Sequence, residues 1–432
     1  MTKKLSFVFD WIGPLGPLRN GVIPDMFDLS ATFGASGHAR HPSRIGCPVV
    51  NRVFTDDNKI HCNIFSSAYM PEHSFLYELS TNECVHYLEL FTEYSGFISH
   101  HDSKMISYRV LQRVKDKTAY MIISNPFESF LEDYHLMAIY KYFTNLQVPL
   151  SQIIYSSCCP NGKEIYEDFC RRYNLVPEMQ CEFMPIYASN LKKETTRGKV
   201  YKPGPKEKDF LCFNRRYRDH RLMFGLLLDK HNLLDHSYFS LAKYQPESGA
   251  DFRSRAEAIN AQQHNAPMEI SVDNISAFFN KLPLVLDTDD FNGLHPTAVT
   301  EDINRLYDTS LVHIISETNF YTNIIHQTEK TIKPIANMQP FIMLGSPNSL
   351  KSIKDMGFKT FSDFWDESYD LEFDHTQRLL KIIELCNTIS AWIPSRKVEF
   401  SYKVKEIVEY NYNHFMNSRL VELDRWIEKY GN

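Results

Sequence analysis

Short apolar runs alternate with stretches whose apolar residues recur every three or four positions along most of the chain. The first pattern predicts strands and the second predicts helices. Strands are expected at 5–10, 59–65, 109–114, 119–124, 153–156, 209–213, 282–287, 311–316 and 341–344. Helices are expected at 133–143, 162–173, 222–228, 374–393, within 398–430 and from residue 328 onward. This alternation is typical of an α/β fold with a mostly parallel sheet.

The chain has 432 residues, more than one ordinary core requires, so two domains are expected. A charged run broken by proline and glycine spans residues 192–208 and has no apolar period. We therefore expect an N-terminal acceptor domain at 1–195, a linker at 196–208, a nucleotide-binding domain at 209–370 and C-terminal helices at 371–432. Two such domains leave a cleft between them.

Polar residues flank a predicted strand in the second half in a pattern that suits a nucleotide diphosphate. Glu317 and Asn319 follow the strand at 311–316, and Thr328, Glu329 and Lys330 open the next helix. Another strand then ends at a glycine turn. Lys330 can neutralise a phosphate, and Glu329 can accept hydrogen bonds from a ribose diol.

The order of these pieces resembles the C-terminal signature of the fucosyltransferase-type glycosyltransferases. The pieces are Glu317 with Asn319, then Thr328-Glu329-Lys330, then Pro340-Phe341-Ile342 with Gly345. The resemblance implies a GT-B fold, in which two Rossmann-like domains face a central cleft and C-terminal helices follow. It also implies a UDP- or GDP-linked sugar donor and a metal-independent transfer. One departure is Asn337-Met338-Gln339, which stands where the family usually has a small residue and glycine.

A basic turn lies between the strand at 209–213 and the helix at 222–228. The run from Asn214 to Arg221 contains four arginines, and a helix start after a strand favours anion binding. In the fucosyltransferase family an arginine of this segment contacts the diphosphate. By position Arg221 is the closest match and Arg215 is second, while a solvated surface turn is the alternative interpretation.

The N-terminal half offers two loops that suit an acceptor site. In one, the imidazoles of His100 and His101 stand beside Asp102, and an imidazole oriented by a carboxylate can accept a hydroxyl proton. Asp25 is the rival base. The other loop is rich in glycine and proline and follows the first strand, where open α/β sheets bind ligands. Its candidate acceptor-loop residues are Asp10, Gly13, Gly16 and Arg19.

A fainter resemblance points to the DNA glycosyltransferases of T-even-type bacteriophages, which share the GT-B plan and modify hydroxymethylcytosine. The His100-His101-Asp102 cluster and the basic segments at 40–52 and 192–208 fit a duplex DNA acceptor. The net charge of −6 counts against DNA, and a glycan acceptor needs no basic face. A nucleotide-binding protein without transfer activity and a purely structural α/β protein are the alternatives from other classes.

Cysteine usage and the N-terminus indicate the compartment. Nine cysteines without a CxxC pair favour reduced thiols, and the sequence shows neither a secretory signal nor a membrane span. We therefore expect a cytoplasmic protein, in the host cytoplasm if a phage encodes it, with no membrane partner. The acidic run at 287–290 resembles a metal-binding Asp-x-Asp motif only loosely, so no metal is expected.

Overall fold

The computed structural model describes residues 5–8, 85–91, 112, 114–117, 119–125, 131–183, 199–214, 218–241, 270–286 and 301–417. The chain divides into two compact units. One consists of Met1–Asn190 with Arg419–Asn432, and the other of Leu191–Ser418.

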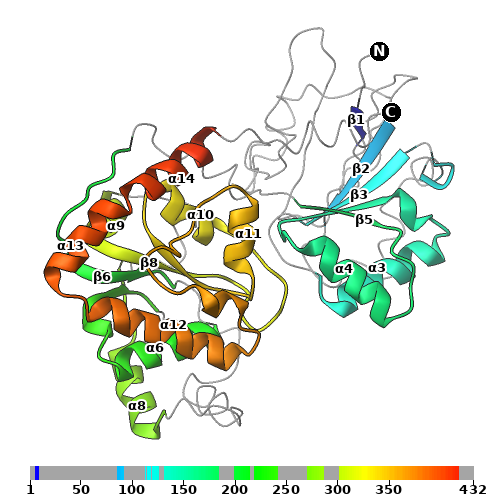
Figure 1. The fold of residues 1–432 in the computed structure, drawn as a ribbon. Coiled ribbons are helices and arrows are strands. Elements are labelled where there is room, and N and C mark those ends of the chain that lie inside the picture. Colours follow the sequence, from blue (N-terminus) through cyan, green and yellow to red (C-terminus); the bar gives the residue numbers. More distant parts are fainter. Residues whose placement is uncertain are drawn as a thin grey trace, which may run out of the picture. The chain divides into compact units, whose positions relative to one another are not determined.

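The first unit contains a five-stranded sheet in the order β1-β2-β3-β4-β5, and all four pairings are parallel. Helices α3 and α4 connect its last three strands and lie side by side (Figure 1). The tyrosine hydroxyls of Tyr140 and Tyr166 meet at 2.7 Å between these helices. The elements are β1 (Leu5–Val8), β2 (Val85–Phe91), β3 (Ala119–Asn125), α3 (Asp133–Asn145), η4 (Leu150–Gln152), β4 (Ile153–Ser157), α4 (Gly162–Arg172) and β5 (Gln180–Phe183).

The second unit contains a four-stranded parallel sheet in the order β7-β6-β8-β9. Its central strand β8 is buried at every position and rich in branched apolar residues, as a strand covered on both faces requires. The elements before and including β8 are β6 (Lys208–Cys212), α6 (Asp219–Lys230), η5 (Leu234–His236), β7 (Ser237–Phe239), α8 (Val272–Lys281), α9 (Glu301–Thr309) and β8 (Ser310–Ser316).

Helices cover both faces of this second sheet. Helices α9, α10 and α14 lie on one face, and α6, α8 and α12 lie on the other (Figure 1). The elements after β8 are α10 (Glu329–Ala336), β9 (Phe341–Leu344), α11 (Ser349–Asp355), η7 (Ser368–Leu371), α12 (His375–Ser390), α13 (Pro394–Lys403) and α14 (Lys405–Asn417).

Polar side chains cap three of these helices at their N-termini. The Ser271 hydroxyl accepts the N–H of Asn274 and forms a capping box at α8. The Asp374 carboxylate accepts the N–H of Gln377 at α12, and Thr328 caps α10. Such caps satisfy N–H groups that have no partner inside the helix, so they fix where each helix begins.

The strand expected at 282–287 is wrong over its described residues, and the strand expected at 109–114 is wrong at its described end. Within the described residues 282–286 the chain makes a single antiparallel bridge, from Leu284 to Leu241, because Pro283 has no N–H and cannot join a ladder. At the end of the 109–114 segment, Gln112 and Val114 are helical. The N–H of Asp116 bonds to the carbonyl of Gln112 at 2.8 Å, as in one helical turn.

Most of the other expected elements that fall on described residues are present, including β1, β3, α3, β4, α4, β6, α6, β8, α10, β9 and α12. The strand at 59–65 lies outside the described residues. Strands β2, β5 and β7 were not predicted from the sequence, and β7 has only three residues, too few to show a period. The expectation of a parallel arrangement is confirmed for both sheets.

Candidate functional site

The second sheet reverses its winding direction between β6 and β8. From β6 the chain moves to β7 on one side, and from β8 it moves to β9 on the other. The loops after β6 and β8 therefore part at the carboxyl edge of the sheet, where open α/β sheets bind ligands. Of the candidate donor residues that the structure describes, Glu317, Asn319 and Thr328 lie between β8 and α10, Glu329 and Lys330 open α10, and Arg221 lies in the first turn of α6.

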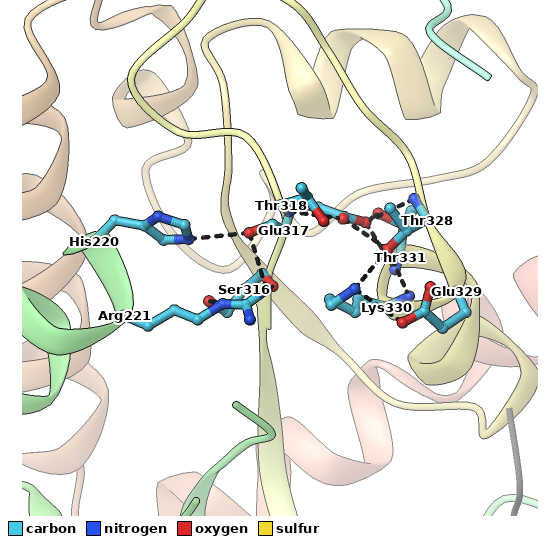
Figure 2. A network of polar contacts seen from close by, with 9 residues as sticks. All are labelled: His220, Arg221, Ser316, Glu317, Thr318, Thr328, Glu329, Lys330 and Thr331. Carbon is cyan, nitrogen blue, oxygen red and sulfur yellow. Dashed lines mark hydrogen bonds and ion pairs between the residues drawn. The ribbon is translucent and has the colours of Figure 1, made fainter. Parts of the chain in front are cut away.

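Glu317 lies directly after β8, and its buried carboxylate accepts five hydrogen bonds (Figure 2). The N–H and hydroxyl of Thr328 donate at 3.0 and 2.8 Å, and those of Thr331 donate at 3.2 and 2.5 Å. The fifth donor is the N–H of Thr318 at 3.2 Å. The carboxylate thus satisfies N–H groups at the start of α10 and complements the positive end of the helix.

Lys330 and Glu329 form an ion pair in the first turn of α10. The Lys330 ammonium donates to Glu329 Oε1 at 2.8 Å and to Thr328 Oγ1 at 3.2 Å (Figure 2). Burial acts to raise the pKa of Glu329, but the charges of Lys330 and Lys333 outweigh it and hold that pKa at about 2. Glu329 is therefore ionised at neutral pH. The Lys330 side chain is 25% exposed, so its ammonium borders on solvent.

His220 and Arg221 approach the end of β8 from α6. The Arg221 guanidinium donates to the hydroxyl and carbonyl of Ser316 at 3.2 and 3.0 Å, and to the carbonyl of Glu317 at 3.3 Å. His220 Nε2 contacts the same Glu317 carbonyl at 3.0 Å. Burial lowers the pKa of Arg221 to about 10 and places that of His220 well below its usual range. His220 is consequently neutral and donates to the carbonyl through Nε2–H.

Glu317 thus connects Arg221 with the segment that carries Lys330, two of the cationic candidates for the donor site. Its carbonyl binds Arg221, and its carboxylate binds the threonines that flank Lys330. Arg221 is only 2% exposed, so the contacts of its guanidinium named above are with the protein itself, and a direct contact with a ligand stays a prediction. Asn319 donates to the Ile324 carbonyl at 3.2 Å within the loop after β8.

Several sequence-predicted site residues lie outside the described part of the chain. They are Arg215, the base candidates His100, His101, Asp102 and Asp25, the acceptor-loop residues Asp10, Gly13, Gly16 and Arg19, and the acidic run 287–290. Their roles stay predictions.

Thr331 and His220 had no role in the site predicted from the sequence. Thr331 stands at the third helical position after the cap Thr328, and that spacing could have suggested a side chain facing the helix start. His220 carries no such signal, because its partner, the Glu317 carbonyl, lies 97 residues further along the chain, just after β8.

Within the described ranges, no group of three or more His, Cys, Asp or Glu side chains is arranged to hold a metal ion. The same part of the chain contains no helix that is both long and apolar enough to cross a membrane.

Comparisons with known proteins show a likeness to a solved structure. No protein-family model matches the sequence. A search of curated proteins likewise gives no match. Among solved structures, the chain is similar to an alpha,alpha-trehalose-phosphate synthase (UDP-forming) from Burkholderia vietnamiensis, with a TM-score of 0.37 and 10% identity. The match covers 80% of this chain and 75% of the synthase chain. At this level it gives no information about substrate or reaction.

Proposed function

We propose that this protein is a glycosyltransferase whose UDP- or GDP-linked donor binds at the carboxyl edge of the β6–β9 sheet. The observation that carries the proposal is the Lys330 ammonium. An ammonium has three N–H donors, and contacts with the described residues use two of them, on Thr328 and Glu329. The third donor and the exposed part of the side chain are available to a phosphate oxygen.

Other charged residues at helix starts on the carboxyl edge of the sheet suit the rest of a nucleoside diphosphate. Arg218 is an exposed second cation at the N-cap of α6, whose helix dipole favours an anion. The ionised Glu329 carboxylate can accept a hydrogen bond from a ribose hydroxyl. In this proposal Lys330 and Arg218 bind the diphosphate, and Glu329 binds the ribose. That arrangement explains why the three charged side chains lie where the sheet reverses its winding direction.

The reaction joins the anomeric carbon of the donor sugar to an acceptor hydroxyl. The hydroxyl oxygen forms the new C–O bond while its proton passes to a base, and the bond from the anomeric carbon to the diphosphate breaks. The electron pair of that bond leaves with the nucleoside diphosphate. Lys330 and Arg218 stabilise the negative charge that develops on this leaving group.

The acceptor side of the proposal rests on the sequence alone. We place the base among His100, His101, Asp102 and Asp25, and hydroxymethylcytosine in duplex DNA is the first acceptor to test, with a glycan as the second. The fucosyltransferase-like order of Glu317, Thr328-Glu329-Lys330 and Gly345 supports the donor site and says nothing of the acceptor.

A product assay tests the proposed function. The protein is incubated with UDP- and GDP-linked sugars and with hydroxymethylated DNA, unmodified DNA or oligosaccharides, and the products are identified by mass spectrometry. With one of the donors, we expect one acceptor to gain the mass of a hexose or a pentose. Lys330→Ala should abolish the gain, and Lys403→Ala, which removes a lysine from a surface ion pair on α13, should retain it. Nucleotide binding without any transfer would instead support the non-catalytic binding protein.

A further inference from the structure

Three large apolar side chains are exposed near the carboxyl edge of the second sheet. Tyr321 is 44% exposed and lies in the loop between β8 and α10. Leu371 is the last residue of η7 and is 64% exposed, and Phe373, between η7 and α12, is 61% exposed. Exposed apolar groups that gather beside a ligand site are a sign of binding. We call these three residues the Tyr321 patch.

A buried arginine joins the two segments of the Tyr321 patch. The Arg378 guanidinium donates to the carbonyls of Phe320 and Glu372, the residues adjacent to Tyr321 and Phe373. It also donates to the Gly345 carbonyl after β9 at 3.1 Å, and it lies 4.4 Å from the centre of the Phe320 ring. One side chain therefore holds the loops after β8 and β9 together with the entrance to α12.

The Tyr321 ring is braced by three other rings. Its plane is nearly perpendicular to those of Phe320, His220 and His375, at 89°, 72° and 76°, with centroids 5.2, 6.1 and 5.0 Å away. Phe320 and His220 in turn stack on each other at 5.2 Å. A ring already held in place loses little conformational entropy when a ligand covers it, so the entropic cost of stacking a ligand on Tyr321 is small.

The loop that carries Tyr321 ends at the start of α10, next to Lys330, the cation of the proposed donor site. Glu317 accepts hydrogen bonds from Thr318 at the start of this loop and from Thr328 at its end, so one carboxylate closes it. Lys330 follows two residues later. His220 contacts both the Glu317 carbonyl and the Tyr321 ring, which places the ring on the α6 side of the same network.

We propose that Tyr321 stacks on the base of the nucleoside diphosphate whose phosphates bind at Lys330. This inference rests on the proposed function and assigns the part of the site that recognises the nucleoside. An aromatic ring stacks on any base because every base has a π-face. Tyr321 therefore contributes affinity for the nucleoside as a whole, and the choice between uracil and guanine falls to polar groups around it.

Binding measurements with nucleoside diphosphates and with pyrophosphate separate stacking from phosphate binding. Isothermal titration compares UDP, GDP and inorganic pyrophosphate on the wild type, Tyr321→Ala, Tyr321→Phe and the control Tyr402→Ala, which removes an exposed tyrosine of α13. We expect Tyr321→Ala to weaken the preferred nucleoside diphosphate about 10- to 100-fold. The affinity for pyrophosphate should change less than about twofold, since it has no base. Tyr321→Phe keeps the ring and should bind like the wild type.

The outcomes distinguish this inference from the proposed function. If the wild type binds a nucleoside diphosphate and Tyr321→Ala binds it as Tyr402→Ala does, the stacking role is overturned and the donor site stands. If Tyr321→Ala loses pyrophosphate affinity as well, the ring merely supports the loop, and the inference is again overturned. If the wild type binds neither UDP nor GDP, the proposed function itself fails.

Discussion

The carboxylate of Glu317 accepts a 3.2 Å hydrogen bond from the backbone N–H of Thr331, so a side chain at the end of β8 occupies the first turn of α10. A helix N-terminus often binds phosphate through its N–H groups. Here two of these positions are taken by Glu317, because Thr328 donates to it too. A diphosphate at this helix must therefore be held by side chains, which is why Lys330 is central to the proposed function.

Replacing Glu317 should destabilise the second unit. Glu317→Ala leaves the buried donors of Thr328 and Thr331 without their acceptor, and we expect a loss of at least about 3 kcal/mol in the free energy of unfolding. Glu317→Gln keeps one acceptor oxygen and should lose about 1 to 2 kcal/mol. Urea denaturation measures both, with Glu399→Gln on α13 as an exposed control that should show no change. A Glu317→Ala variant as stable as that control would contradict the structural role of this carboxylate.

The ion pair of Lys330 and Glu329 should make stability depend on acid pH. The pKa of Glu329 is held at about 2, below its ordinary value of 4.5, so its contribution is complete above about pH 4.5 and is lost as the pH falls toward 2. In the wild type this contribution amounts to roughly 3 kcal/mol. Lys330→Met removes the cation paired with Glu329 and should reduce the contribution of Glu329 to stability.

Urea denaturation at a series of pH values from 6 to 3 tests this. The stability difference between wild type and Lys330→Met should narrow as the pH falls. Lys351→Met, which breaks the exposed pair of Lys351 with Asp355, is the control and should stay within about 1 kcal/mol of the wild type at each pH. If the stability difference between wild type and Lys330→Met were the same at every pH, the pKa of Glu329 would not depend on this lysine.

His313, in the middle of β8, should make the fold sensitive to mild acid. Burial lowers the pKa of His313 to about 3, and its ring stacks on Tyr307 with centroids 5.4 Å apart. In the unfolded chain His313 binds a proton near pH 6.5, whereas in the folded chain it stays neutral down to about pH 3. Between these two pH values, His313 therefore lowers the free energy of unfolding by about 1.4 kcal/mol for each pH unit of acidification.

His313→Phe keeps an aromatic ring on Tyr307 and removes the titrating group. We expect its stability to stay within about 1 kcal/mol of wild type at pH 8 and to decline less steeply below pH 6. Chemical denaturation at pH 8, 6 and 5 measures the slopes. Parallel slopes for the two proteins would show that His313 takes up its proton in the folded state.

Arg378 should be irreplaceable by lysine. Its guanidinium reaches three carbonyls at once, those of Gly345, Phe320 and Glu372. An ammonium lacks the planar fork and cannot satisfy all three, so Arg378→Lys should lose about 2 kcal/mol or more of unfolding free energy. Because the loops after β8 and β9 would loosen, nucleotide affinity should fall too. Denaturation and nucleotide titration of the same sample measure both effects. An Arg378→Lys variant that matches the wild type in both would contradict the role of Arg378 in holding these loops together.

The strand–helix–strand unit from β8 to β9 can be predicted from sequence because its signals are local. Every residue of β8 is buried, Thr328 marks the start of α10, and Gly345 follows β9. The segment at 282–287 looks equally apolar, yet Pro283 and an exposed Val285 leave it with one bridge. Apolar composition alone does not distinguish a strand from such an extended segment.

The roles of individual site residues depend on contacts that sequence does not show. Glu317 is recognisable as a site residue, but its carboxylate partners lie as far as 14 residues along the chain and across a loop. Arg221 belongs to a run of arginines that resembles a solvated turn. It is nevertheless buried, because residues 220–228 of α6 are buried all around the helix and leave it no polar face.

Nucleotide binding by Lys330 variants tests the central claim most directly. Thermal shift and isothermal titration with UDP and GDP are compared for the wild type, Lys330→Ala and the control Lys403→Ala. We predict that one nucleotide at about 100 times its dissociation constant stabilises the wild type and the control by about 2.7 kcal/mol, with a matching rise in Tm. Lys330→Ala should lose at least about tenfold in affinity. Equal binding by Lys330→Ala and the control, or no response of the wild type to either nucleotide, would contradict the account.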